Sequence, residues 1–247
     1  MTLNEQSFPD RLARATLLKE ACATMTPAFT PAGADLTIAA QTTLLVTLTN
    51  CCTNVNNAVN DLKEKTDERA TVVKDIKARV TRALGRVKSN LVWAPKLPLV
   101  KAAADSLRAA RVTKTTPLPP PTNPDAPAPA PRNRGGQSYK DIEGHFQKFN
   151  NALTKCTGYD TGAPPDIFSG ALTNLHTAYK TLNDVIPQKE TDLTEVRLDR
   201  LRRFSGKLPL PDGTTSLRDR FIRIKTAVGS QYGRTSDQFL SVKNIKF

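Results

Sequence analysis

No stretch of this 247-residue chain approaches the about 20 apolar residues that a membrane-spanning helix requires. The first ten residues combine neither a basic start nor an apolar run, so they do not resemble a secretory signal. We therefore expect a soluble, cytoplasmic protein that does not associate with membranes. Secretion by a route that needs no cleavable signal stays open.

Cysteine and histidine are too few and too scattered to build a disulfide framework or a metal site. Cys51 and Cys52 are adjacent, so on a helix their side chains point about 100° apart and cannot easily bridge. No Cys-x-x-Cys pair occurs, and neither His145 nor His176 has a second ligand at metal-binding spacing. We predict free thiols that pack as small apolar groups, with no metal site and no cofactor.

The motifs of common enzyme classes are also missing. The chain has no P-loop, no dinucleotide-binding glycine pattern and no Gly-x-Ser-x-Gly elbow. Its carboxylates alternate with Lys and Arg, as in residues 61–69, which is typical of a solvated helix surface. We predict no catalytic residue and expect that the protein is not an enzyme.

Aromatic residues make up only 6% of the chain, so any core is built mainly from Leu, Val, Ile and Ala. The basic surplus, a formal net charge of +13, is spread along the sequence and is densest between residues 92 and 138. A nucleic-acid module usually gathers its charge on one face. The spread-out surplus therefore indicates only a weak bias toward anionic partners.

One helical pattern appears twice. Asp35 and Asp166 each follow a stretch rich in Pro, Gly and Ala, and each opens a run whose apolar positions share one helical face. The first run places on that face Leu36, Ala40, Leu44, Leu48, Cys51, Val55 and Leu62. The second run places there Ile167, Ala171, Leu175, Tyr179, Leu182, Ile186 and Leu193. Every pair has the same offset, which predicts an internal duplication.

Each half is expected to contain three helices. The first helices are predicted over 9–25 and from about residue 138, and the second helices begin at Asp35 and Asp166, whose carboxylates suit N-terminal capping. The third helices carry apolar residues at helical spacing, at Ile76, Val80, Ala83 and Val87 and at Leu217, Phe221, Ile224 and Val228. A loop over 206–213 precedes the third helix of the second half only.

Glycine and proline mark where the helices stop. None occurs between Asp35 and Ala83, so the second and third helices of the first half are expected to be nearly continuous. In the second half, Pro187 predicts a kink or a break near residues 185–186. Eight prolines between Pro117 and Pro131 predict an extended polyproline II spacer, and a short helix over 99–112 is expected to precede it. A recognition role for the P-x-x-P spacing there stays open.

We therefore predict an all-α protein with two related three-helix units packed as a bundle with pseudo-twofold symmetry. The units are expected over 1–91 and 139–247, joined by a basic, proline-rich linker over 92–138. Two separate bundles held apart by the linker are the alternative.

The C-terminal tail carries a pattern of its own. It reads Tyr-Gly-x-x-Ser-x-x-Phe-x-x-Val-x-x-Ile-x-Phe, from Tyr232 to Phe247. Together with the Arg-rich stretch over 197–204, this tail resembles the C-terminal signature of uncharacterised bacterial proteins with two helical halves. The resemblance implies no activity, cofactor or functional residue. Locally, Gly233 is expected to end a helix with a positive φ, and Ser236 to cap a last turn that docks on the bundle.

Arginines on the third helices are the candidate site. They are Arg79, Arg82 and Arg86 in the first half, with Arg220 and Arg223 at matching positions in the second. Such a row can bind phosphates, but Asp75 and Asp219 flank it and no exposed aromatics alternate with it, so ion pairing between helices is the other interpretation. We predict a non-enzymatic interaction or structural protein that binds a protein partner or itself. The alternative is polyanion or nucleic-acid binding through these five arginines.

Overall fold

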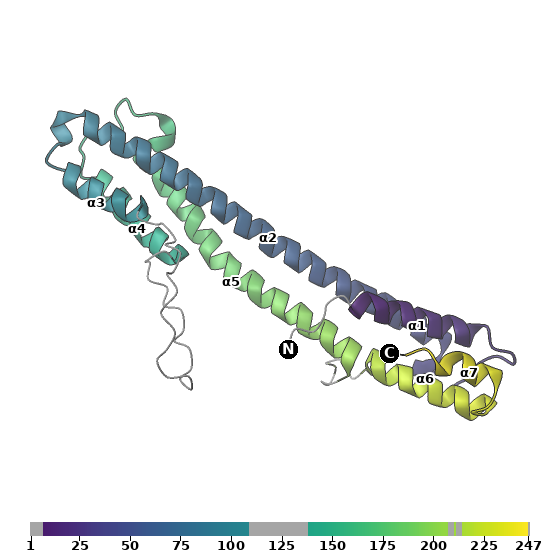
Figure 1. The fold of residues 1–247 in the computed structure, drawn as a ribbon. Coiled ribbons are helices and arrows are strands. Elements are labelled where there is room, and N and C mark those ends of the chain that lie inside the picture. Colours follow the sequence, from purple (N-terminus) through teal and green to yellow (C-terminus); the bar gives the residue numbers. More distant parts are fainter. Residues whose placement is uncertain (1–6, 109–137, 207–209, 211–213, 247) are drawn as a thin grey trace, which may run out of the picture. The chain divides into compact units, whose positions relative to one another are not determined.

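The computed structural model describes residues 7–108, 138–206, 210 and 214–246 (Figure 1). Its α-helices are α1 (Ser7–Ala23), α2 (Ile38–Ser89), α3 (Leu97–Arg108), α4 (Tyr139–Leu153), α5 (Ser169–Ser205), α6 (Leu217–Tyr232) and α7 (Asp237–Lys243). Three 3-10 turns join them: η1 (Ala34–Leu36), η2 (Leu91–Trp93) and η3 (Pro165–Ile167). The described residues contain no strand, which confirms the all-α prediction. The proline-rich run and most of the 206–213 loop lie outside the described residues.

The chain divides into two compact units. The terminal unit contains Met1–Leu62 and Lys189–Phe247, and the central unit contains Lys63–Gln188. The terminal unit therefore takes α1, the start of α2, the end of α5, α6 and α7, while the central unit takes the rest of α2, α3, α4 and the start of α5. These units do not coincide with the predicted segments 1–91, 92–138 and 139–247, because each unit combines helices from both halves of the sequence.

The core of the terminal unit lies among α1, α2, α6 and α7. Its buried side chains include Phe8, Leu18, Leu36, Leu48, Phe204, Phe221, Val228 and Val242. The C-terminal tail closes this core, since Val242 is fully buried and Phe239 and Ile245 pack against it. The predicted docking of the tail is thereby confirmed for its described residues.

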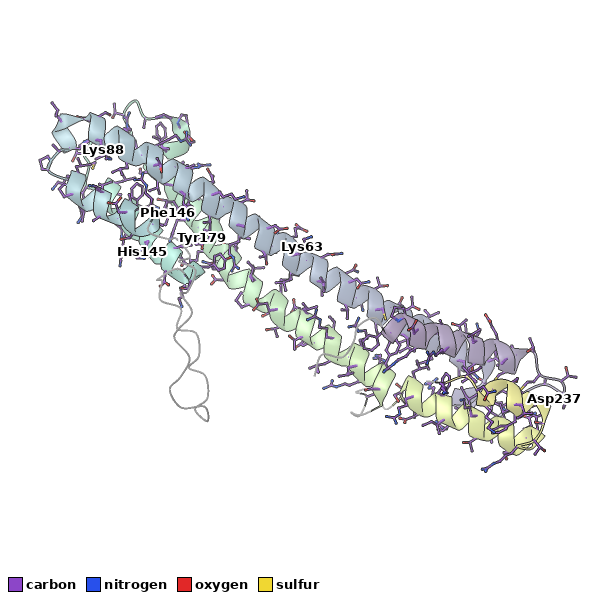
Figure 2. The ribbon with its side chains drawn as sticks, in the orientation of Figure 1. Lys63, Lys88, His145, Phe146, Tyr179 and Asp237 are labelled. Carbon is purple, nitrogen blue, oxygen red and sulfur yellow. The ribbon has the colours of Figure 1, made fainter. Side chains whose placement is uncertain are left out.

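The core of the central unit includes residues that the sequence analysis placed in the linker. Its buried side chains include Ile76, Val80, Trp93, Val100, Leu107, Phe146, Phe149 and Tyr179. Figure 2 labels Phe146 and Tyr179 in this unit. The Tyr179 hydroxyl donates to the Tyr139 carbonyl at 2.9 Å. The short helix predicted over 99–112 is α3; it begins at Leu97 and packs in this core, and its expected last turn lies outside the described residues.

Several helix ends follow local sequence chemistry. Ser138 caps α4 in a capping box with Asp141, and Ser216 and Ser236 cap α6 and α7 with their side-chain oxygens. Gly233 follows α6 with a φ of 91°, as predicted for a position that needs a left-handed backbone. The predicted helix boundaries at Ser138, Gly233 and Ser236 are confirmed, because each depends on neighbouring residues only; the cap at Ser216 was not predicted.

Both long helices are continuous. α2 runs for 52 residues, which confirms the expected junction of the second and third helices. α5 also runs unbroken through Pro187, so a break there was the wrong prediction. A proline inside a helix removes one backbone hydrogen bond. Leu182 and Ile186 before it and Leu193 after it are buried.

Candidate functional site

The arginines of α6 contact η1 in the terminal unit. Arg223 donates to both carboxylate oxygens of Asp35, at 2.5 and 3.1 Å. Arg220 donates to the Asp35 carbonyl at 3.2 Å and to the Thr215 hydroxyl at 3.1 Å. The two guanidinium groups thus hold one aspartate by its side chain and by its main chain.

The arginines of α2 contact η3 in the central unit in the same way. Arg82 donates to the Asp166 carboxylate, and Arg79 donates to the Asp166 carbonyl at 2.9 Å. Arg79 also forms an ion pair with Asp75 at 2.8 Å, one turn earlier on its own helix. We call the two arrangements the terminal clasp (Asp35, Arg220 and Arg223) and the central clasp (Asp166, Arg79 and Arg82).

Asp35 and Asp166 were expected to cap the second helices, and that prediction was wrong. Neither η1 nor η3 has a side-chain cap. α2 begins three residues after Asp35, where the Thr37 hydroxyl accepts from the Ala40 amide at 3.3 Å. At the start of α5 the Ser169 amide donates to the Asp160 carboxylate at 2.8 Å. The two aspartates instead accept from arginines distant in the sequence.

Arg86 binds the loop that leads into η3. Its guanidinium donates to the carbonyls of Tyr159, Thr161 and Gly162 at 2.5 to 3.2 Å. The same group lies 5.7 Å from the ring centroid of Trp93 and 5.6 Å from that of Tyr159. Arg86 therefore fixes a loop by main-chain contacts and cation–π contacts.

The charges of the clasps shift the acidity of their members. Burial alone would raise the pKa of Asp35. The hydrogen bond from Arg223 and the charges of Arg223 and Arg220 lower this pKa by more than burial raises it, so the net pKa lies below the ordinary value. The hydrogen bond to Asp75 raises the pKa of Arg79 against the opposing effect of burial. Both shifts favour the charged forms that the clasps need.

A second pair of contacts recurs at the starts of α1 and α4. In the terminal unit the Arg200 guanidinium lies 4.3 Å from the ring centroid of Phe8, and Phe8 meets Phe204 edge-on at 4.9 Å. In the central unit the Arg69 guanidinium lies 3.3 Å from the ring centroid of Tyr139. In each case the arginine comes from one half of the sequence and the aromatic ring from the other.

The five predicted arginines divide between the two compact units. Arg79, Arg82 and Arg86 belong to the central unit, and Arg220 and Arg223 to the terminal unit. Each of them donates to a carboxylate, a carbonyl or a hydroxyl. The sequence analysis missed the acceptors: Asp35, Asp166 and the loop carbonyls over 159–162. The available signal was that Asp and Arg recur in matching positions of both halves.

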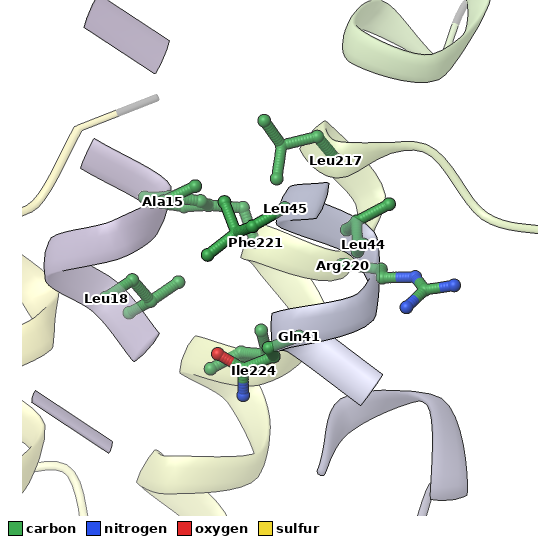
Figure 3. A pocket seen from close by; sticks show the side chains of 9 residues that line it. All are labelled: Ala15, Leu18, Gln41, Leu44, Leu45, Leu217, Arg220, Phe221 and Ile224. Atoms are coloured by element: carbon green, nitrogen blue, oxygen red, sulfur yellow. The ribbon is translucent and has the colours of Figure 1, made fainter. Parts of the chain in front are cut away.

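The cavity of the terminal unit has little room for a small ligand, whereas the central unit has a larger groove. The cavity in Figure 3 lies among α1, α2 and α6 and has a volume of about 20 Å³, whereas ligand pockets measure about 300 to 1,000 Å³. It is lined by Ala15, Leu18, Gln41, Leu44, Leu45, Leu217, Arg220, Phe221 and Ile224. A more open groove of about 340 Å³ lies between α3 and α4, with Leu99 and three alanines among its lining residues and Lys148 and Lys155 as its charged ones.

The described residues contain neither an activated thiol nor a cluster of metal ligands. All four cysteines are free, and burial raises the pKa of Cys22 and Cys51 to about 11, which keeps both thiols protonated at neutral pH. No group of three His, Cys, Asp or Glu in the described part of the chain could hold a metal ion. His176 packs against Phe146, with ring centroids 5.9 Å apart.

Comparison with known proteins adds no relative. No model of a known protein family matches the chain, and neither a curated protein nor a solved structure matches it. Within the described residues, no helix is long and apolar enough to cross a membrane.

Proposed function

We propose that this protein is a non-enzymatic helical scaffold in which the two halves of the sequence complete each other's packing. The observation that carries the proposal is the reciprocity of the clasps. Arg223 of the second half holds Asp35 of the first, while Arg82 of the first half holds Asp166 of the second. Each half thus supplies the third helix that binds the other half's 3-10 turn.

The matching positions support an internal duplication. Asp35 and Asp166 are 131 positions apart, and the same offset relates Phe8 to Tyr139 and Arg69 to Arg200. In the third helices the offset is 141, and it relates Arg79 to Arg220 and Arg82 to Arg223. The ten extra positions agree with an insertion that includes the loop over 206–213. A pseudo-twofold repeat with exchanged third helices accounts for all five pairs.

In this proposal the arginine rows are structural. A guanidinium that already donates to a carboxylate and to carbonyls has fewer donors and less net charge to offer a phosphate. Arg82 and Arg223 still have side chains that are 52% and 44% exposed. The alternative function is therefore polyanion or nucleic-acid binding through Arg79, Arg82, Arg86, Arg220 and Arg223. The function that we propose is instead binding to a protein partner or self-association.

Two double variants of equal charge separate these functions. The first replaces clasp arginines, Arg82→Gln with Arg223→Gln. The control, Arg218→Gln with Arg234→Gln, removes the same charge from exposed positions. Retention on immobilised heparin is measured against salt concentration, together with the thermal midpoint of each variant.

The scaffold proposal expects the clasp variant to lose thermal stability and both variants to lose the same small amount of heparin retention. A steep salt dependence that disappears only in the clasp variant, with stability unchanged, would support the polyanion alternative and overturn the scaffold role of these arginines.

A further inference from the structure

The outer face of α2 between Ala39 and Asn60 carries no charged residue. Charged residues make up 24% of the whole chain, and they return on α2 directly after this stretch at Asp61, Lys63 and Glu64 (Figure 2 labels Lys63). The exposed face of an amphipathic helix normally carries the charged residues. Here that rule fails over about six helical turns.

Seven of the exposed positions between Ala39 and Asn60 recur at alternating steps of three and four residues. One set is Ala39, Val46, Thr53 and Asn60, and the other is Thr42, Thr49 and Asn56; all seven are exposed. At about 100° per residue the first set lies on the side away from the buried stripe that includes Leu48 and Val55, and the second set lies about a quarter to a third of a turn from that stripe. Contact residues of two paired helices recur at such steps, and here they are small or uncharged, with Ala39 and Val46 as the apolar ones. We call this face the α2 seam.

The threonines of the seam region satisfy their hydroxyls within the helix. Each donates to the carbonyl four residues earlier at 2.9 to 3.2 Å, at Thr42, Thr43, Thr47, Thr49 and Thr53. The γ-methyl groups are left for contact, beside Val46, which is 56% exposed. Thr, Val and Asn form helices less readily than Lys, Glu or Ala. Helix stability therefore does not explain the choice of these residues.

We propose that the α2 seam binds the same face of a second copy of this chain. Two copies with a net charge of +13 repel each other, and this seam lets them approach without placing charge against charge. A strongly charged partner would find no opposite charge on the seam with which to pair. A face that binds its own copy forms a closed, twofold interface. The inference rests on the proposed interaction function and names its partner.

Sedimentation velocity of the full chain over a wide concentration range tests the seam. The wild type is expected to show a reversible monomer–dimer equilibrium that strengthens with salt, because salt screens the net repulsion. Val46→Lys with Thr53→Lys is expected to remain monomeric where the wild type is dimeric, because four lysines would meet in the interface. Val46→Gln with Thr53→Gln weakens the same dimer without adding charge.

Thr177→Lys with Thr181→Lys provides the matched control. Both threonines are exposed on α5 and make the same hydrogen bond to the carbonyl four residues earlier, at 3.1 and 3.0 Å. This variant adds equal charge and is expected to dimerise as the wild type does. Far-UV circular dichroism checks that all variants keep their helices.

A wild type that sediments as a monomer at every concentration would overturn the inference, as would a Val46→Lys, Thr53→Lys variant that dimerises normally. A monomer that binds phosphatidylcholine vesicles through the seam would also overturn it, since the occupant would then be a lipid surface. None of these results would disturb the clasps, whose failure is detected separately by the thermal stability of the clasp variants.

Discussion

Arg223 donates to both carboxylate oxygens of Asp35, although 188 positions of sequence separate the two residues. The central unit repeats this contact between Arg82 and Asp166, which are 84 positions apart. In one pair the arginine follows the aspartate in the chain, and in the other it precedes it. This inversion distinguishes exchange between the two halves from two halves that each fold alone.

The terminal clasp should show a measurable coupling energy. We expect Arg223→Ala, Asp35→Ala and their double variant to give a coupling of about 1 kcal/mol in a double-mutant cycle, since partly exposed ion pairs contribute little and two-point contacts contribute more. The same cycle on Arg82 and Asp166 measures the equivalent coupling in the central unit. Chemical denaturation measures both, and additive effects in both cycles would contradict the clasps.

The contribution of Asp35 should depend on pH. Its pKa is lowered in the folded chain relative to the ordinary value of 3.8, so its charged form stabilises the fold above that value. The difference in free energy of unfolding between the wild type and Asp35→Asn should therefore be constant near neutral pH. It should shrink as the pH falls below about 4 and through the folded pKa. A difference that does not change with pH would show that Arg223 exerts no electrostatic effect.

Phe8 and Tyr139, the two rings that each contact an arginine, should differ in how much stability is lost when they are replaced by alanine. Phe8 is only 3% exposed, so Phe8→Ala should destabilise the chain by about 3 kcal/mol. Tyr139 is 42% exposed, so Tyr139→Ala should cost clearly less. Urea unfolding curves compare the two variants. Equal losses would mean that the Arg69–Tyr139 contact contributes more than its exposure suggests.

Two glycines should respond in opposite directions to alanine. Gly233 has a φ of 91°, which an L side chain rarely adopts, so Gly233→Ala should destabilise by about 1 kcal/mol. Gly85 lies inside α2 and a Cβ there would meet nothing within 4 Å, so Gly85→Ala should stabilise by about 0.5 to 1 kcal/mol. Thermal midpoints check the signs, and a destabilising Gly85→Ala would show that this part of α2 is not a regular helix.

The sequence predicted those features that depend on neighbouring residues. Ser138, Gly233 and Ser236 mark helix ends by local hydrogen bonds and backbone geometry, and all three act as predicted. The buried stripes were also predictable, because apolar spacing shows which face of a helix avoids water. The short helix expected over 99–112 corresponds to α3, which begins at Leu97.

The sequence did not predict which helix covers which stripe. A carboxylate before an apolar helix looks like a cap in the sequence. The actual role of Asp35 depends on an arginine 188 positions away, which local sequence does not reveal. Hydrophobic spacing is the same whether a third helix packs on its own half or on the other half. For the same reason the segment boundaries over 1–91 and 139–247 followed the duplication, whereas the compact units follow the contacts.

Cleavage between the halves tests the central claim most directly. A site for a sequence-specific protease placed between Pro117 and Pro131 lets the folded chain be cut into one fragment with α1 to α3 and another with α4 to α7. If the two halves of the sequence exchange their third helices, the cut fragments should elute together in size-exclusion chromatography with an unchanged circular dichroism spectrum. They should separate only in denaturant. Two fragments that elute apart while each keeps its helical content would contradict this exchange.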